Sequence, residues 1–406
     1  MHIAIVGKNY KGLRNYLKSR GYTYTVLRDK IKEDGKHRKN TVYIDFNDLE
    51  NEIRKIEQLP KIDACMAVYE QYVEPCAVIA RALKLPGLPI EAAAACTDKS
   101  KMRELFAKAP KKISPAFKKI SSENDLIEFA KNSSFPLIIK PTNLAKSLLV
   151  TRCDDLEELI GAYNAAKEIA PKIYAKYAPR ASLEMIVEEF MEGSIHSIDA
   201  YIDKNGKVSL LDDIVDYQTG YDIGFDDNFH YSRVIPSKLS HSIQKEFRDV
   251  AVKAVEALGM KSSAAHIEII VTIEGPRVVE IGARNGGYRE RMHELANGID
   301  ILGNQLSTIL DQPLDITPKK NEPCAVLELF PKTPGIFSGI QNEDLLKGLQ
   351  SFNYLSIKPK IGDFVGKSSQ GYKASAVIVL HSNDSSVFQN DLQFVNDQVC
   401  VTTKLV

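Results

Sequence analysis

Two glutamates lie within an otherwise apolar pair of strands in the segment HIEIIVTIEGPRVVEIGARNGG, which spans residues 266–287. The first half has an apolar residue at every second position, the period of a half-buried strand; these residues are Ile267, Ile269, Val271 and Ile273. Val279 and Ile281 continue the pattern in the second half, and the Glu-Gly-Pro sequence at 274–276 is typical of a turn. The segment therefore predicts a β-hairpin with one face in the core.

A turn centred on Glu274 determines which residues face each other across this hairpin. It places Glu268 directly opposite Glu280 on one face. On the other face it pairs apolar residues, namely Ile267 with Ile281 and Ile269 with Val279. Like charges that are opposed across a ladder repel each other, so a positive group is expected between the two carboxylates.

A hard divalent cation is one candidate for that positive group. Mg²⁺ is usually held by one or two carboxylates, and substrate phosphates complete its shell. Arg284 falls on the same face, four residues past Glu280, where it is suited to stabilise a developing negative charge. An exposed sheet face with hydrated carboxylates is the alternative, and the hairpin alone does not decide between the two.

The chain has 406 residues, which predicts roughly two to four packed units. Its 53 basic and 53 acidic residues cancel, so no overall charge points to nucleic acid or an anionic membrane as a partner. Six cysteines without a CxxC spacing predict reduced thiols. The apolar part of MHIAIVGKNY at the N-terminus is too short for a signal peptide or a membrane span. Together these features predict a cytoplasmic protein.

Strands and helices alternate in the first part of the chain, from the strand-like HIAIVG to a helical pattern over residues 72–83. Such alternation predicts a parallel sheet, so residues 1–95 are expected to form a Rossmann-like domain. Farther along, residues 97–109 have the pattern of an amphipathic helix, and FPLIIKP at 135–141 has that of a strand.

The middle of the chain contains a segment without a clear period. Residues 215–238 are rich in Asp, Tyr, Gly and His, which predicts a long functional loop. Residues 240–258 have a strongly amphipathic helical pattern that ends at Gly259 and leads into the hairpin. From about residue 325 onward, short strands and turns predict a small separate α+β or β-rich subdomain.

Several features occur in a telling order along the chain. Lys99 opens a helix, Lys140 ends a strand before the loop TNLAKS, the acidic strand VEEFMEG follows, and the hairpin with its arginine comes last. This order resembles the ATP-grasp superfamily, and most closely its carboxylate–amine ligases of the L-amino acid ligase (dipeptide ligase) type. In that group HvE and vvEiGAR.GG recur, and here the likeness is most specific over residues 264–298.

The resemblance covers residues 1 to about 400 and implies an ATP-grasp fold of the α/β and α+β classes. It implies an N-terminal Rossmann-like pre-ATP-grasp domain, a central lid lobe, a catalytic lobe with the metal-binding hairpin and a small C-terminal subdomain. The expected boundaries are 1–95, 96–205, 206–322 and 323–406.

The resemblance also implies roles for individual residues. The ATP-binding residues would be Lys99, Lys140, Ser147, Glu188, Glu189, Phe190, Met191 and His196, with His196 at the ribose. Glu268 and Glu280 would bind Mg²⁺ or Mn²⁺, and Arg284 would hold the acyl phosphate and the tetrahedral intermediate. The candidate substrate residues are His230, Tyr288, Arg289 and Arg291.

Some of these roles have open alternatives. Glu188 and Glu189 are adjacent on one strand and point to opposite faces, so at most one of them is expected to face the nucleotide. His196 is equally compatible with a structural histidine, and Arg289 and Arg291 are equally compatible with solvated side chains.

The chain departs from the family pattern in two places. Gly282 stands where many relatives have an asparagine as a third metal ligand, so the metal site rests on two carboxylates. The loop TNLAKS lacks the usual run of glycines, and its backbone N–H groups around Ala145 and Ser147, with the charge of Lys146, would have to cradle the phosphates.

The implied activity is that of an ATP-dependent carboxylate–amine ligase, which forms an amide or peptide bond through an acyl phosphate and releases ADP and phosphate. The expected partners are a small-molecule carboxylate and an amine, and amino acids are favoured for both. Whether the protein forms a homodimer is left open. Two alternatives keep the fold: a carboxylase that acts through carboxyphosphate, and a protein that binds ATP without turnover.

Overall fold

The structure is a computed structural model that describes residues 1–35, 38–144 and 148–404. Its N-terminal domain contains a parallel four-stranded sheet in the order β3-β2-β1-β4, as the alternation of strands and helices predicts. The elements are β1 (His2–Val6), α1 (Lys11–Ser19), β2 (Thr23–Asp29), β3 (Thr41–Ile44), α2 (Leu49–Glu57), β4 (Ala64–Ala67) and α3 (Val73–Ala82).

Two short helices, α4 (Ile90–Thr97) and α5 (Lys99–Phe106), lead into the lid lobe. This lobe has an antiparallel sheet in the order β5-β8-β6-β7, and its two helices pack on one face through apolar residues such as Leu126 and Leu159. The elements are β5 (Phe117–Ile120), α6 (Glu123–Lys131), β6 (Leu137–Pro141), β7 (Thr151–Cys153), α7 (Leu156–Tyr177) and β8 (Met185–Glu189).

The largest sheet has nine strands, eight of them in the order β14-β13-β9-β11-β12-β15-β19-β17, with β10 paired to β9. Helix α8 (His241–Ala257) covers one face through Phe247 and Val250, which pack with Ile198 and Ile267. The first strands and nearby helices are β9 (Gly193–Ile202), β10 (Val208–Leu210), β11 (Val215–Thr219), β12 (His230–Ile235), β13 (Ser263–Thr272), β14 (Gly275–Gly282), α9 (Arg289–Asn297) and α10 (Ile301–Ile309).

The C-terminal region, for which the sequence predicts a separate subdomain, contributes three strands to this large sheet. They are β15 (Cys324–Leu329), β17 (Phe352–Ile357) and β19 (Ala376–His381). The remainder forms a small sheet in the order β18-β16-β20 with two helices. Its elements are β16 (Gly335–Ile340), α11 (Glu343–Gly348), β18 (Phe364–Val365), α12 (Ser385–Gln398) and β20 (Val401–Lys404).

The prediction of a long loop over residues 215–238 is wrong. Strands β11 and β12 lie within it and pair antiparallel in the middle of the large sheet. Polar residues occupy many positions of these strands, among them Asp216, Gln218, His230 and Ser232. Because Gln218 and His230 line a cavity and Ser232 is buried among strands, the strands lack the apolar alternation that marks a half-buried strand in a sequence.

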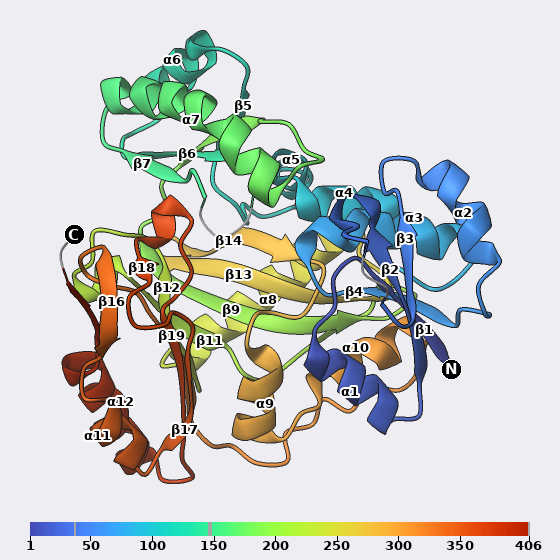
Figure 1. Cartoon of the computed structure of the whole chain (residues 1–406). Coiled ribbons are helices and arrows are strands. Elements are labelled where there is room, and N and C mark those ends of the chain that lie inside the picture. Colours follow the sequence, from blue (N-terminus) through green and yellow to red (C-terminus); the bar gives the residue numbers. More distant parts are fainter. Residues whose placement is uncertain (36–37, 145–147, 405–406) are drawn as a thin grey trace.

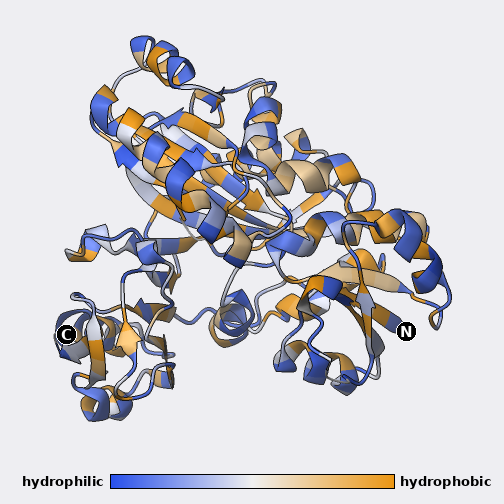
Figure 2. Cartoon of the chain, turned by 45° about the horizontal axis from the view of Figure 1, so that its top comes forward, coloured by the Kyte–Doolittle hydropathy of each residue, from blue (hydrophilic) through white to orange (hydrophobic). Residues whose placement is uncertain are grey.

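The arrangement in space places the hairpin β13–β14 between the lobes. Figure 1 shows the lid lobe above β14, with the N-terminal domain to one side and the C-terminal helices α11 and α12 on the other. Figure 2 shows that the outer helices carry hydrophobic and hydrophilic residues in alternation, as expected for helices that cover a sheet on one side. Among the residues described, no helix is both long and apolar enough to cross a membrane.

Candidate active site

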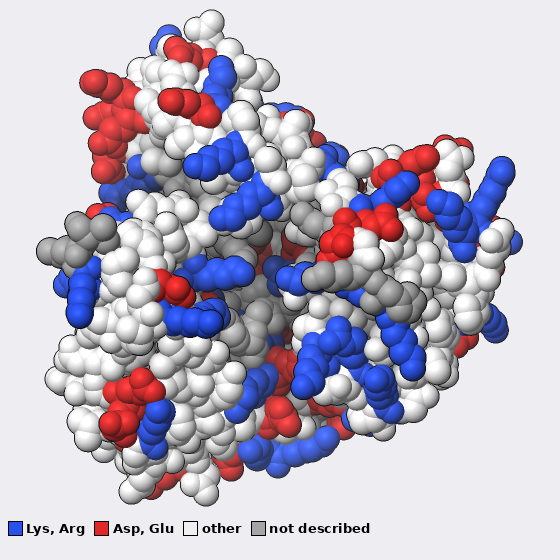
Figure 3. All heavy atoms as spheres, viewed as in Figure 1, with Lys and Arg blue, Asp and Glu red and all other residues white. Residues whose placement is uncertain are grey.

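A cavity of about 3130 Å³ lies between the N-terminal domain, the lid lobe and the large sheet. Figure 3 shows a hollow in the middle of one face of the molecule, with lysine and arginine side chains around its rim. The lining comes from the hairpin β13–β14, from the ends of β6 and β8, and from the turn Glu70–Tyr72 that follows β4. Charged groups from all three parts therefore meet in one space.

The hairpin presents two opposed carboxylates to this cavity. Glu268 pairs directly with Glu280, as predicted, and both residues line the cavity. The register shifts by one residue beyond this pair, so Ile269 lies opposite Val278 and not opposite Val279 as predicted. Such a shift is a β-bulge, which bends the strand locally next to the two glutamates.

Lys99 provides a positive charge at Glu280. Asp98 caps α5 by accepting a hydrogen bond from the backbone N–H of Ser100 at 2.8 Å, which fixes Lys99 in the first turn. The Nζ of Lys99 lies 3.0 Å from Oε2 of Glu280 and donates to the carbonyl oxygen of Leu144 at 3.0 Å. Burial opposes the charged form, but Glu280 outweighs it and raises the pKa of Lys99. Lys99 is thus a charged group of the site.

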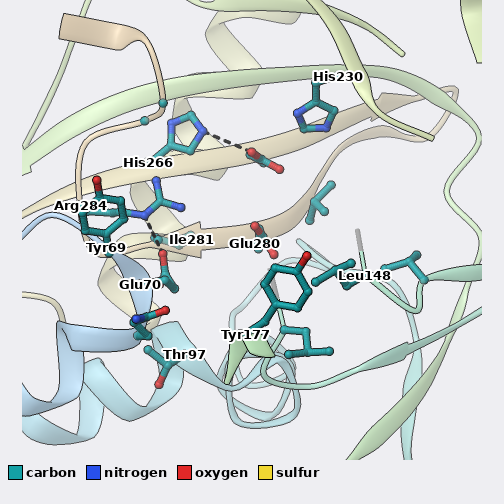
Figure 4. A pocket seen from close by; sticks show the side chains of 18 of the residues that line it. Tyr69, Glu70, Thr97, Leu148, Tyr177, His230, His266, Glu280, Ile281 and Arg284 are labelled. Atoms are coloured by element: carbon teal, nitrogen blue, oxygen red, sulfur yellow. Dashed lines mark hydrogen bonds and ion pairs between the residues drawn. The ribbon is translucent and has the colours of Figure 1, made fainter. Parts of the chain in front are cut away.

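Arg284 follows the end of β14 and faces the cavity, where Figure 4 shows it beside Glu70. Its Nε lies 2.8 Å from Oε2 of Glu70, and its Nη1 donates to the carbonyl oxygen of Asn285 at 3.1 Å. These two contacts fix the guanidinium group. Sequence reasoning missed Glu70, because it belongs to another domain and no local pattern marks it.

His266 connects Glu268 to the interior. Its Nε2 lies 3.3 Å from Oε1 of Glu268, and its Nδ1 lies 3.1 Å from Oδ1 of Asp199. Burial opposes protonation of this imidazole, but Asp199 outweighs it and raises the pKa of His266 to about 10. The site requires glycine at 286, because a Cβ there would lie 2.5 Å from Nδ1 of His266.

This charged histidine keeps Glu268 ionised. Burial acts against the carboxylate, but the hydrogen bond from His266 and the positive charges nearby outweigh it and lower the pKa of Glu268. Sequence reasoning did not assign His266 a role. The signal was present, since residues two apart on a strand share a face and His266 precedes Glu268 by two positions.

Lys140 stands at the end of β6, in a buried ion-pair group. Its Nζ lies 2.6 Å from Oε2 of Glu188, and Nε of Arg103 lies 2.8 Å from Oε1 of the same carboxylate. Burial opposes ionisation of Glu188, but Arg103 and Lys140 outweigh it and lower its pKa. Burial also lowers the pKa of Lys140, to about 8, although Glu188 opposes this shift.

Four of the other residues that are predicted to bind ATP lie at the end of β8 or just after it. Glu188 is 2% exposed and directed toward Lys140, whereas the Glu189 side chain is 39% exposed and accepts a hydrogen bond from the backbone N–H of Ala116. The two side chains thus point to opposite faces of β8, as predicted. Both residues nevertheless line the cavity, as do Phe190 and Met191, so which glutamate contacts the nucleotide stays a prediction. Ser147, Lys146 and Ala145 lie outside the described residues.

The prediction of a ribose contact for His196 is wrong. On β9, His196 lies on the same face as Ile198, which packs under α8, and its ring stands edge-on to Phe247 of that helix. Its two ring nitrogens are occupied by Asp216 at 2.8 Å and Ser194 at 2.7 Å. His196 is therefore a structural residue on the side of the sheet away from the cavity.

Three of the four candidate substrate residues line the cavity. The rings of His230 and Tyr217 pack in a T-shaped, edge-to-face arrangement. Burial lowers the pKa of His230, although Glu268 opposes this shift. Tyr288 donates a hydrogen bond to Glu328 at 2.8 Å, and Arg291 donates to Asn353 at 2.7 Å.

Arg289, the fourth candidate, is fully buried, so its prediction as a substrate residue is wrong. It donates to Oδ2 of Asp199 at 3.1 Å and to the hydroxyl oxygens of Ser197 at 2.8 Å and Tyr217 at 2.5 Å. These bonds hold Asp199 in the position where it contacts His266. Sequence alone does not distinguish Arg289 from Arg291, because both occupy the start of one helix.

The donor set at Glu268 and Glu280 fits a magnesium ion that is completed by phosphates. Within residues 1–35, 38–144 and 148–404, no group of three or more His, Cys, Asp or Glu side chains is arranged to hold a metal. A site that depends only on protein ligands is therefore absent from the described part. Mg²⁺ typically keeps several waters and takes one or two carboxylates plus substrate phosphates, which is what this pair offers.

Comparisons with known proteins agree with this architecture. A family model of the ATP-grasp domain matches residues 133–290. Alanine–anticapsin ligase of Bacillus subtilis (strain 168) is 30% identical over 259 residues, which are 60% of this chain and 54% of that protein. D-alanine–D-alanine ligase of Nocardia farcinica is 30% identical over 184 residues, which are 44% of this chain and 48% of that protein.

A solved structure extends the likeness over the whole chain. The crystal structure of L-amino acid ligase from Bacillus licheniformis covers 99% of this chain and 98% of its own, with a TM-score of 0.79 and 19% identity. Residues 133–290 thus match the ATP-grasp domain, and the chain as a whole has the ATP-grasp fold that the resemblance implies. Its relatives named above are ligases of amino acids, and the chain spans about half of the length of the two curated ones.

The shifted pKa of Lys140 predicts a pH dependence. Lys140 is protonated below about pH 8 and loses its charge above it, so its attraction for phosphate should weaken as the pH rises. We expect kcat/KM for ATP, which reports the free protein, to fall by up to about tenfold per pH unit above this value.

The control for this prediction is Lys140→Arg, whose guanidinium stays charged throughout the range. Its profile of kcat/KM against pH from 7 to 10 should be flat where that of the wild type falls. A wild-type profile that is also flat up to pH 10 would remove Lys140 from the phosphate site.

Proposed function

We propose that this protein is an ATP-dependent carboxylate–amine ligase that joins two small molecules, at least one of them an amino acid. The observation that carries the proposal is the direct pairing of Glu268 with Glu280 in a cavity that also contains Lys99 and Arg284. Paired carboxylates next to phosphate-binding cations suit a metal-bound triphosphate. Three of the similar proteins have names of amino acid ligases, which supports the substrate class.

The reaction would proceed in two steps. A substrate carboxylate attacks the γ-phosphate of ATP, which yields an acyl phosphate and ADP. A primary amine then attacks the acyl carbon, and phosphate leaves as the amide forms. Mg²⁺, when bound by Glu268 and Glu280, supplies neutralisation of the charge on the terminal phosphates.

The residues of the chain would have distinct parts in these steps. Lys99 and Lys140 would bind the phosphates as compact point charges. Arg284, fixed by Glu70 and the carbonyl oxygen of Asn285, would donate to the oxyanion that develops on the acyl carbon. This fixed orientation matters, because a preorganised donor needs no rearrangement at the moment of reaction.

The lid lobe would protect the acyl phosphate from water. Contacts on both sides hold it over the cavity. Arg180 donates to Asp29 and to the carbonyl oxygen of Gln71 in the N-terminal domain, and Tyr177 donates to the carbonyl oxygen of Gly371 at 2.9 Å. Exclusion of water is needed, since an exposed acyl phosphate would hydrolyse.

One assay tests the proposal against the two alternatives. ADP release is measured with Mg²⁺-ATP and pooled amino acids, with and without bicarbonate. ADP that forms only with amino acids, together with a dipeptide in the mass spectrum, is the expected result. Dependence on bicarbonate would support a carboxylase, and ATP binding without ADP under every condition would support a non-catalytic protein. Either outcome would overturn the ligase.

A further inference from the structure

Glu70 carries a buried oxygen atom that lacks a partner. Its Oε2 lies 2.8 Å from Nε of Arg284, but its Oε1 is buried and has no hydrogen-bond donor among the described residues. A buried acceptor without a partner costs about as much free energy as a lost hydrogen bond, and the cost is larger when the acceptor is charged. Such an atom in a cavity wall is therefore suited to accept a hydrogen bond from a ligand.

The surroundings of Glu70 favour a positively charged donor. Burial raises the pKa of Glu70, and Glu280 adds to this effect, whereas Arg284 and Lys99 only partly oppose it. The charged form of this carboxyl group is thus disfavoured in its surroundings. A further positive charge at Oε1 would stabilise it.

The absence of a side chain at Gly282 leaves space for the carboxylate of Glu70. A Cβ at Gly282 would lie 2.9 Å from Oε2 of Glu70, closer than side-chain atoms normally approach. The space that a side chain at position 282 would take is therefore occupied by a carboxylate from the N-terminal domain. Figure 4 shows Glu70 and Arg284 together on the side of the cavity away from His230.

We propose that Oε1 of Glu70 binds the ammonium group of the amine substrate next to the acyl carbon and accepts a proton from it, so that the neutral amine is free to attack. This inference rests on the proposed ligase function. If Arg284 holds the oxyanion, then a group bound to the carboxylate that contacts Arg284 lies close to the reacting carbon. The N-terminal domain would thus supply the site for the amine, while the hairpin and the lid supply the site for ATP and the acid.

The experiment compares two nucleophiles in Glu70→Gln. The pooled amino acids act as amines and arrive as ammonium ions, whereas hydroxylamine is largely uncharged near neutral pH and traps the acyl phosphate as a hydroxamate. We expect dipeptide formation to fall roughly 10- to 100-fold, the loss of one hydrogen bond between charged groups, while hydroxamate formation stays within about threefold. Glu57→Gln, an exposed residue of α2, is the matched control and should leave both products unchanged.

The outcomes separate this inference from the proposed function. Equal loss of both products in Glu70→Gln, in a variant with an unchanged melting temperature, would mean that Glu70 only positions Arg284. No loss of either product would remove Glu70 from the reaction. Glu70→Asp keeps the charge but withdraws the carboxylate, so it should show the same selective loss of the dipeptide to a smaller degree. If Glu70→Gln does not fold, Glu70→Asp shows whether Glu70 binds the amine or only positions Arg284. A wild-type chain that forms neither product would overturn the ligase itself.

Discussion

Glu280→Gln is expected to abolish Mg²⁺-dependent ADP formation while the chain remains folded. Glu280 lies directly opposite Glu268 and 3.0 Å from Lys99, so its replacement removes half of the carboxylate pair and one partner of a lysine. A metal that neutralises transferring phosphates contributes several kcal/mol, so kcat should fall on the order of 10³-fold or more. The measurement is ADP release under saturating ATP and amino acids.

The matched control is Glu274→Gln in the turn of the same hairpin, where the side chain is 70% exposed and outside the cavity lining. It should have wild-type activity. The melting temperature of Glu280→Gln should stay close to that of the wild type, because the Glu280 side chain is one-third exposed and is held by a single lysine. Wild-type turnover in Glu280→Gln would show that the pair does not hold a metal during the reaction.

Arg284→Met should have the second largest effect, a fall of roughly 10²- to 10³-fold in kcat, which is the usual loss for one donor to an oxyanion. The physical reason is that Arg284 would act on charge that develops only as the amine attacks. The KM for ATP should therefore change much less than kcat. Steady-state ADP release at varied ATP measures both constants.

Arg284→Lys separates charge from geometry at this position. Lysine keeps the positive charge but lacks the planar fork, so we expect it to recover only part of the lost rate. Arg54→Met, on the exposed side of α2, should behave as the wild type. If Arg284→Met raised the KM for ATP and left kcat unchanged, Arg284 would be a ground-state contact of the nucleotide and not the group that stabilises the oxyanion.

The local sequence pattern of the hairpin β13–β14 was enough to predict the part of the site that lies on this hairpin. The alternation of apolar residues and the position of the turn determined that Glu268 faces Glu280, and the structure confirms this pairing. The family resemblance is confirmed as well, since the ATP-grasp model matches this region. The pairing of Ile269 was missed, because a β-bulge depends on contacts outside the hairpin. One such contact is the hydrogen bond from Arg103 to the carbonyl oxygen of the bulged Val279.

What the sequence did not reveal depends on contacts between distant segments. Glu70 meets Arg284 only because the N-terminal domain docks beside the hairpin, and no local spacing encodes that docking. His196 and Arg289 have the right chemistry for a site, but their strand face and helix position direct them into the protein. The metal role of the glutamates, the phosphate roles of the lysines and the role of Arg284 remain predictions.

A crystal structure with Mn²⁺ and a non-hydrolysable ATP analogue, in which anomalous scattering locates the metal, tests most directly whether Glu268 and Glu280 hold a metal at the triphosphate. We expect an anomalous peak between the carboxylates of Glu268 and Glu280, in contact with the terminal phosphates, with Lys99 and Lys140 on the same phosphate chain. A metal bound elsewhere, or a nucleotide whose phosphates lie away from β13 and β14, would contradict this expectation.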